Sequence, residues 1–202
     1  MIHAPSHVGR ANQKKRTRKA IVDACRELID TGGEVTMPEV ARRALVSEAT
    51  AYRYFPDLLS LLSEALAEQW PTPAQMLEPV AASTDPVERI AFACDYLSRH
   101  VLAYAGAVRA MISATITHPV LAGSRPGLRF GLIDEALTSL NDTLGRDNPE
   151  RLAQLKRDLA VVVSAEALFS LTDLCGLSAE DAVASLVRTA TTLTTAAIVS
   201  VE

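Results

Sequence analysis

Two short helices in succession, each opened by a capping residue, restrict the fold of this chain more than any other feature of its sequence. At the first helix, Thr36 can accept a backbone hydrogen bond, and Glu39 follows at the position that completes a capping box. At the second, Ser47 is a favourable N-cap and Pro56 stops the helix. Only a tight turn fits between them. The spacing predicts helices over about 37–44 and 48–54.

Two short helices joined by a tight turn are typical of the helix-turn-helix, a DNA-binding motif whose second helix enters the major groove. The second predicted helix carries hydroxyl groups and a guanidinium near one exposed surface, at Thr50, Tyr52, Arg53 and Tyr54. Groups of this kind bind phosphates and base edges. The small apolar contacts between the two helices are assigned to Ala41, Ala44, Val46 and Ala51.

An amphipathic helix is predicted on each side of this motif. Before it, apolar residues recur at helical spacing over 16–30. After it, Asp57 can cap a leucine-rich helix that continues to Trp70. The predicted division of the chain is a flexible basic arm over 1–15, a three-helix domain over 16–56 and a helical remainder over 57–202.

Composition and the remaining pattern predict an all-α fold. Ala occupies 32 of the 202 positions whereas Gly occupies nine, a balance that favours helices over turn-rich sheets. Further helices are predicted over 86–104, 107–117, 128–144, 149–174 and 179–199, with connections over 71–84 and 118–127. Three widely separated cysteines indicate neither a disulfide framework nor a zinc site, so we expect a reducing compartment.

We expect neither a membrane segment nor a secretory leader. Charges such as Glu166 interrupt the apolar stretches well before the ~20 residues that a membrane span requires. The first residues are polar and then basic, without the apolar region of a signal peptide. The sequence therefore predicts a cytoplasmic protein.

Charge is distributed unevenly along the chain. Residues 1–55 carry ten Lys and Arg against six Asp and Glu, whereas residues 56–202 carry ten against eighteen. The positive charge is concentrated near the N-terminus, at Arg10, Lys14, Lys15, Arg16, Arg18 and Lys19. Such a cluster attracts a polyanion such as the phosphate backbone of nucleic acid, and a solvated basic tail is the alternative interpretation.

The last two predicted helices, 149–174 and 179–199, have apolar surfaces wider than a single stripe. On the first, Leu159 lies on one apolar face and Val161 on another. On the second, threonines keep the surroundings of the apolar face small. A helix that is buried on two sides needs two partners. We expect these helices to pair with their twofold copies in a four-helix dimer interface, with an intramolecular bundle as the alternative.

The segment from Thr36 to Leu62, TMPEVARRALVSEATAYRYFPDLLSLL, resembles the DNA-binding signature of the tetracycline-repressor (TetR) family. The resemblance covers about residues 16–62 and rests on the order of capping box, Val-Ala, Val-Ser, Thr-x-Tyr and Tyr-Phe-Pro. It implies a homodimer with a helix-turn-helix domain and a larger helical domain for effector binding and dimerisation. It also implies a repressor that a small-molecule effector releases from a pseudopalindromic DNA operator.

The resemblance further implies roles for individual residues. Phosphate contacts are implied for Thr36 and Ser47, through their caps, and for Tyr52 and Tyr54. Contacts with the major groove are implied for Thr50 and Arg53. Lys14 and Arg16 would enter the minor groove or neutralise phosphate. Core packing is the other interpretation of Tyr52 and Ala51, and the preferred one for Ala51.

The sequence departs from the family pattern at three positions. Leu45 stands where the family usually has Gly, in a turn where a left-handed backbone would strain a leucine by ~1–2 kcal/mol. Leu58 stands where a lysine usually contacts phosphate, and Tyr54 stands where histidine is frequent. A turn of different local geometry and weaker DNA binding are therefore alternatives.

Candidate effector contacts are the few large or polar side chains on predicted core helices: Trp70, Phe92, Tyr96, His100, Met111, Thr115, Phe130, Glu166 and Phe169. Glu166 is the most specific of them because it shares a face with Leu159, where an unpaired charge is costly. It would bind a polar group of the effector or pair with an arginine such as Arg109 or Arg99.

Two other classes of function compete with a regulator. The sequence contains no Gly-rich phosphate loop, no GxSxG and no HExxH, and its four histidines lack metal-ligand spacing. We therefore expect no enzyme, no cofactor and no metal site. A helical homodimeric adaptor or ligand-binding protein with weakened DNA binding is the other alternative, and steep salt dependence of DNA binding would favour the regulator.

Overall fold

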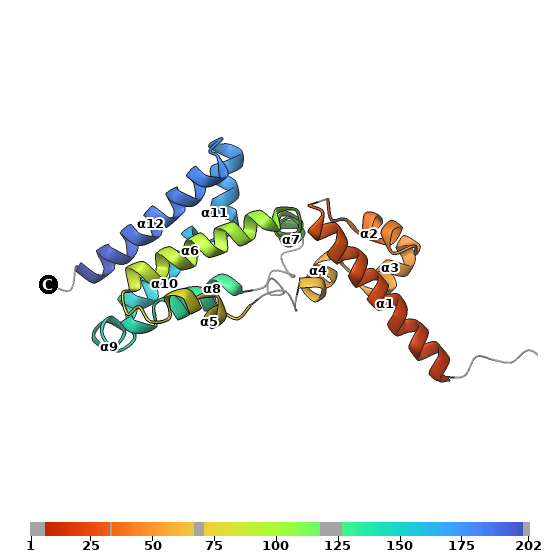
Figure 1. Cartoon of the computed structure of the whole chain (residues 1–202), viewed down its shortest axis with the longest axis horizontal. Coiled ribbons are helices and arrows are strands. Elements are labelled where there is room, and N and C mark those ends of the chain that lie inside the picture. The colour runs from red at the N-terminus through yellow and green to blue at the C-terminus, as the bar shows by residue number, and fades with distance from the viewer. Residues whose placement is uncertain (1–6, 33, 67–70, 118–126, 200–202) are drawn as a thin grey trace, which may run out of the picture. The chain divides into compact units, whose positions relative to one another are not determined.

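The structure of the protein, a computed structural model, describes residues 7–32, 34–66, 71–117 and 127–199. Every regular element in these ranges is a helix, so the all-α class predicted from the sequence is confirmed (Figure 1). The chain forms two compact units. They comprise residues 1–70 with 104–126, and residues 71–103 with 127–202.

Five helices with described residues make up the first unit. They are α1 (His7–Asp30), α2 (Met37–Arg43), α3 (Glu48–Tyr54), α4 (Leu58–Leu66) and α7 (Ala105–Thr117). Helix α1 packs against α2 and α4, α2 packs against α3, and α4 packs against α7. The core of this unit includes the fully buried side chains of Ile21, Val40, Ala51, Phe55 and Leu62. Because α4 and α7 pack here, the unit extends beyond the predicted domain of residues 16–56.

Side-chain caps fix the start of α2 and α3. Thr36 accepts a hydrogen bond from the backbone N–H of Glu39 (3.4 Å), and Ser47 accepts one from that of Thr50 (3.2 Å). Both caps are those that the sequence predicts. The Glu39 carboxylate, expected to complete a capping box, accepts hydrogen bonds from the Arg42 guanidinium, which lowers the pKa of Glu39.

The turn between α2 and α3 holds Leu45 in the left-handed region, with φ +55°. The N–H of Val46 donates to the carbonyl of Ala41 (3.0 Å), and the N–H of Leu45 donates to that of Arg42 (3.3 Å). These two hydrogen bonds end α2 in a Schellman motif, which normally has glycine at the left-handed position. The turn therefore keeps the geometry expected of the glycine, and the alternative of a different local geometry is excluded.

The second unit is built around α6 (Pro86–Ala103), which packs against α12 (Ala179–Val199) and α8 (Leu128–Ala136). Helix α10 (Pro149–Val162) packs against the same two helices (Figure 1). The shorter elements are α5 (Pro73–Met76), η1 (Glu78–Val80), η3 (Thr138–Leu140), α9 (Leu144–Asp147), α11 (Ala165–Phe169) and the π-helix η4 (Ser170–Leu174). Buried Arg89 of α6 connects that helix to η1 and α8. Its guanidinium donates hydrogen bonds to the carbonyls of Val80 in η1 (3.0 Å) and of Glu135 (2.8 Å) and Ala136 (3.2 Å) in α8.

The N-terminal segment differs from the predicted arm. Helix α1 begins at His7, so residues 7–15 are helical. The residues from Gln13 to Arg18 have unbranched side chains or hydroxyls and good average helix propensity, although they carry no apolar stripe. The predicted loop over 71–84 likewise contains α5 and η1.

Two predicted helices are divided. The predicted helix over 149–174 stops at Val162, because the Ser164 side chain accepts a hydrogen bond from the N–H of Ala167 (3.1 Å) and caps a new helix. The predicted helix over 128–144 stops as an α-helix at Ala136 and gives way to η3.

The strained turn gives a direct stability test. Leu45→Gly should raise the free energy of unfolding by about 0.5–1 kcal/mol, because glycine adopts a positive φ without a Cβ clash. The leucine side chain is 92 % exposed, so its removal sacrifices little burial. Urea unfolding followed by circular dichroism measures the change. Leu45→Ala keeps the Cβ and serves as the control; equal stability of the Gly and Ala variants would mean that the turn stores no strain.

Candidate nucleic-acid interface

Helix α3 buries one side and presents its polar side chains on the other. Ala51 is fully buried, which confirms its interpretation as a core residue. Tyr52 is 48 % exposed and Arg53 is exposed, so core packing does not explain either side chain. Thr50 and Tyr54 lie half-buried on the same helix. The hydroxyl and guanidinium groups of α3 are therefore available to a partner.

A groove of about 580 Å³ lies between α1 and α3. It is lined by Gln13, Lys14, Thr17, Val46, Thr50, Arg53 and Tyr54. The structure thus brings Lys14 together with three of the polar side chains predicted on the recognition helix. An ammonium, a guanidinium and several hydroxyls in one groove form a set of donors that suits phosphate oxygens.

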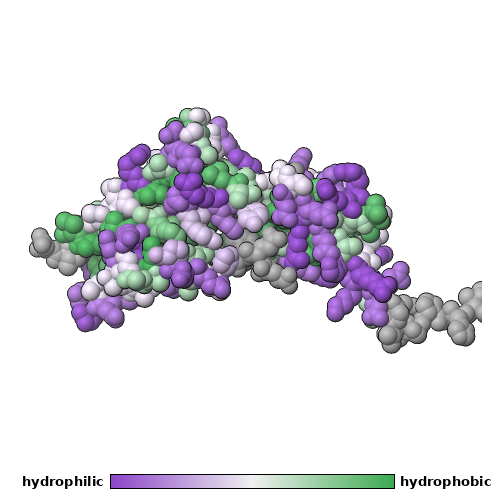
Figure 2. Space-filling model, viewed as in Figure 1, coloured by the Kyte–Doolittle hydropathy of each residue, from purple (hydrophilic) through white to green (hydrophobic). Residues whose placement is uncertain are grey.

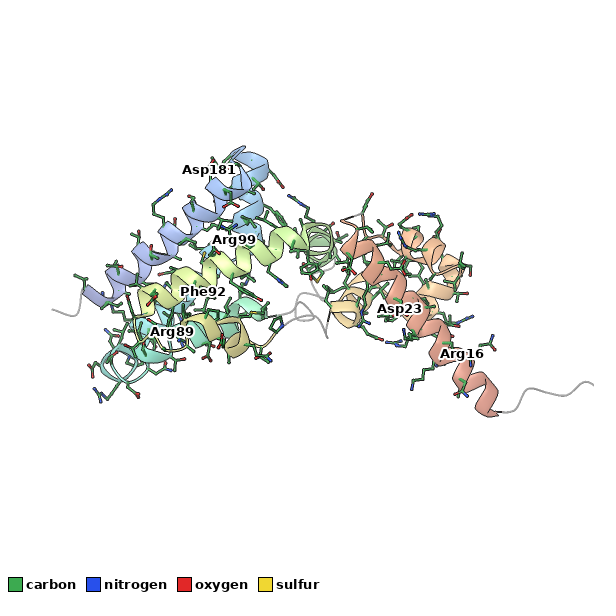
Figure 3. The ribbon with its side chains drawn as sticks, in the orientation of Figure 1. Arg16, Asp23, Arg89, Phe92, Arg99 and Asp181 are labelled. Carbon is green, nitrogen blue, oxygen red and sulfur yellow. The ribbon has the colours of Figure 1, made fainter. Side chains whose placement is uncertain are left out.

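The other predicted DNA contacts lie outside this groove. Arg16 projects from α1 (Figure 3) and lines a separate groove with Lys15, Lys19 and Glu64. Thr36 is half-buried at the start of α2. Figure 2 shows hydrophilic side chains along α1, in keeping with the charge expected there. The eight predicted residues therefore belong to one unit without forming a single cluster.

Sequence reasoning missed Gln13 and Thr17 as part of the groove. Gln13 lies in the arm predicted over residues 1–15, and Thr17 lies next to the predicted start of the first helix at residue 16. The signal that could have found them is helical spacing, because residues 13, 14 and 17 share one face once α1 is extended.

Three candidate effector residues form a column along α6. The ring centroids of Phe92 and Tyr96 are 6.3 Å apart, and those of Tyr96 and His100 are 6.1 Å apart. Their spacing of four residues places them on one helix face, and all three are half-buried. Burial lowers the pKa of His100, so its imidazole is neutral at pH 7. The column is an aromatic surface without a formal charge of its own.

Glu166, the most specific effector candidate, has a charged partner within the second unit. Its carboxylate pairs with the Arg129 guanidinium of α8 at 3.0 Å. Arg129 was not among the partners expected from the sequence, which were Arg109 and Arg99. Arg99 makes a two-pronged ion pair with Glu180 of α12.

The remaining effector candidates lie on several separate elements. Phe130 is exposed on α8 and Phe169 is buried on α11, both in the second unit. Met111 and Thr115 are buried on α7 of the first unit, where the Thr115 hydroxyl lies 3.1 Å from the Met111 carbonyl. Trp70 lies outside the described residues. Within the second unit, the candidates with direct ring contacts to one another are those of the α6 column.

The cysteines are free thiols. Cys25 and Cys94 are buried, and burial raises the pKa of each to about 12, so both are protonated at neutral pH. Cys175 is exposed. Within the described parts of the chain, no group of three or more His, Cys, Asp or Glu side chains could hold a metal ion.

Helix α12 is more apolar than its burial explains. By length and composition it could cross a membrane, which the sequence analysis did not expect, although one such helix is only a weak indication of a membrane segment. Of its most apolar stretch of 18 residues, 28 % is buried within this chain. On neighbouring α10, Val161 is 71 % exposed. The last long helices thus leave apolar and small side chains uncovered.

The fold of the first unit and the exposed chemistry of α3 define a protein of the helix-turn-helix class. Residues 21–65 match the family described as bacterial regulatory proteins, tetR family. This part of the chain thus carries the DNA-binding domain of that family.

Curated relatives are similar to the N-terminal part of the chain. The HTH-type transcriptional repressor KstR of Rhodococcus jostii (strain RHA1) is 45 % identical over 62 residues, which cover 30 % of this chain and 29 % of the relative. KstR of Mycobacterium tuberculosis (strain H37Rv) is 36 % identical over 101 residues, 48 % of this chain and 46 % of the relative. KstR of Mycolicibacterium smegmatis is 36 % identical over 108 residues, which cover 48 % of this chain and 49 % of the relative. The chain thus spans less than half the length of these relatives.

A solved structure is similar over most of the chain. The crystal structure of a TetR transcriptional regulator from Rhodococcus sp. RHA1 aligns with a TM-score of 0.54 and 23 % sequence identity. The alignment covers 89 % of this chain and 97 % of that one. At this identity the similarity concerns the fold alone, and it includes the helical second unit.

Proposed function

We propose that this protein is a DNA-binding transcriptional repressor that acts as a homodimer in the cytoplasm and leaves its operator when a small molecule binds. The observation that carries this proposal is the groove between α1 and α3, which gathers Lys14, Thr50, Arg53 and Tyr54. Similarity to three proteins named as transcriptional repressors supports repression as the mode of action.

Each side of the groove has its own role in this proposal. Thr50 and Arg53 approach base edges in the major groove, where an arginine can bind guanine through two hydrogen bonds. Lys14 and Tyr54 hold the adjacent phosphates. Because Lys14 belongs to a helix, we assign it to phosphate neutralisation and not to entry into the minor groove. Arg16 binds phosphate separately.

A dimer accounts for the uncovered surface of the last long helices. Helix α12 is apolar yet largely unburied within one chain, and Val161 on α10 is exposed beside it. A twofold partner would cover both surfaces with the same surfaces of its own. Such a dimer would place two recognition helices about 34–36 Å apart, the spacing of successive major grooves on a pseudopalindrome.

The α6 column supports an effector with an apolar ring surface. The half-buried rings of Phe92, Tyr96 and His100 offer stacking contacts, and His100 is neutral. Helices α8 and α11, which carry the charged pair Arg129–Glu166, both pack against α6. Binding that favours a different position of α4 would shift the population away from the conformation that fits DNA.

The adaptor remains the second candidate because of Leu45 and Leu58. Leu45 nevertheless adopts the left-handed conformation, so the turn between α2 and α3 is preserved. Leu58 is half-buried at the start of α4 and removes a single charge-assisted contact. Two changes of this size weaken DNA binding without abolishing the interface.

Replacing Arg53 tests DNA recognition. We expect Arg53→Ala to weaken binding by about 1–3 kcal/mol, the usual cost of a lost arginine–base contact. Fluorescence anisotropy with a duplex selected by the native protein from a random pool, at two salt concentrations, measures the change. Arg146→Ala, which removes an exposed arginine from α9 of the second unit, is the matched control. Loss of the dimer with unchanged DNA affinity per dimer would contradict the assignment.

Replacing Val161 tests the dimer. We expect Val161→Asp to yield monomers at micromolar concentration, because the carboxylate would be buried without a partner at the interface. Analytical ultracentrifugation gives the mass. Ile116→Asp is the control, since Ile116 on α7 is 73 % exposed in the other unit. A native protein that is monomeric at this concentration would exclude the proposed interface.

Replacing Tyr96 tests the effector surface. In a screen of ring-bearing apolar compounds, we expect a compound that releases DNA from the native protein to be at least tenfold less effective on Tyr96→Ala, which breaks the column in its middle. DNA affinity without compound should be unchanged. Leu174→Ala, at an exposed position of η4 outside the column, is the control. Equal release from both variants would place the effector elsewhere.

A further inference from the structure

The Arg18 guanidinium, counted by charge within the basic cluster, is engaged inside the first unit. Its Nη1 donates to the backbone carbonyl of Tyr54, the last residue of α3, at 3.1 Å. Its Nε donates to one oxygen of the Glu64 carboxylate on α4 at 3.0 Å, and its Nη2 to the other oxygen. Its centre lies 4.2 Å from the centroid of the Phe55 ring. One side chain of α1 thus contacts the end of α3, its C-cap and α4.

These contacts act where a helix is weakest. The last carbonyls of a helix have no intrahelical partner, and a cation beside them is favourable. Phe55, which follows directly, is 1 % exposed and therefore fixed in the core. Arg18 holds the C-terminal end of the recognition helix on α1, opposite the Ser47 cap at its other end.

Glu64 determines the orientation of this guanidinium. A two-pronged arginine–carboxylate pair fixes the plane of the guanidinium, because both hydrogen bonds lie in it. Arg18 can then present Nη1 to Tyr54 and its flat face to Phe55. The groove around the pair also holds Lys15, Lys19 and other charged side chains, but the Glu64 carboxylate comes from α4.

We propose that Arg18 is a positioning residue for the recognition helix and that Glu64 couples the place of α4 to it. Arg18 does not act as a phosphate contact. The inference rests on the proposed function in DNA binding and adds a route by which α4 controls it. A displacement of α4 that separates Glu64 from Arg18 loosens the end of α3.

The direction in which one substitution changes DNA affinity tests the proposal. Loss of an acidic side chain near a DNA interface ordinarily strengthens binding, because it reduces repulsion from phosphate. We expect Glu64→Gln to weaken binding of the selected duplex roughly two- to fivefold, the range that a partly exposed ion pair supports. Glu34→Gln, the same chemical change in the loop before α2, is the control and should leave affinity equal or higher.

A double-mutant cycle separates positioning from general destabilisation. In an Arg18→Gln background, Glu64→Gln should cause no further weakening, because the coupling partner is already absent. Arg18→Gln should also leave the salt dependence of binding unchanged. Arg16→Ala should reduce the slope of log K against log salt by about 0.9 per subunit, as expected for one lost phosphate contact in each. Additive effects, or a reduced slope for Arg18→Gln, would overturn the proposal.

Amide hydrogen exchange tests the same contact without DNA. We expect Glu64→Gln to accelerate exchange in the last turn of α3 while the circular dichroism spectrum keeps its helical content. Stronger DNA binding by Glu64→Gln together with unchanged exchange overturns the inference. A native protein that binds no duplex at either salt concentration overturns the proposed function, and the exchange result then decides the positioning role by itself.

Discussion

The recognition helix is too short to hold its own shape, and the arrangement of the first unit follows from that constraint. Helix α3 has seven residues, whereas isolated helices below ~12–15 residues are marginal in water. Its conformation is imposed from outside: the Ser47 side chain caps its start, Ala51 is buried along its side, and Phe55 is buried at its end. Arg18 adds a hydrogen bond to the Tyr54 carbonyl. The rigidity of the surface that α3 presents to DNA therefore depends on these few contacts.

Local signals account for the part of the fold that the sequence predicted well. Helix α3 has the expected bounds because Ser47 caps its start and Pro56 follows its end, and α12 begins where the Ser178 cap predicts. The break at Ser164 was not predictable, because it lies in a long apolar run that is equally compatible with an unbroken helix. Residues 7–15 lack an apolar stripe, so amphipathic spacing gave no reason to extend α1.

The candidate site residues also differ in how far a local sequence signal could identify them. Most DNA-contacting candidates are close together in the sequence, and a local motif was sufficient to propose them. The effector candidates come from separate elements, and only packing showed that Met111 and Thr115 belong to a different unit from the α6 column. The contacts of Arg18 were the least predictable, because its partners Tyr54 and Glu64 lie 36 and 46 residues away in the sequence. Composition could count its charge but not reveal that α3 and α4 already use it.

The path of the chain links the proposed effector surface to a neighbour of α4. The chain passes from the second unit to the first between residues 103 and 104. Helix α6 carries the aromatic column and is followed at once by α7, which packs against α4 in the first unit. A ligand that shifts α6 therefore acts on a segment covalently continuous with a neighbour of α4. Because α3 depends on a few polar contacts at its ends, a displacement of α4 large enough to separate Glu64 from Arg18 removes an anchor without unfolding any helix. Under the proposed positioning role, a small, local loss of that kind lowers DNA affinity, because α3 has only seven residues.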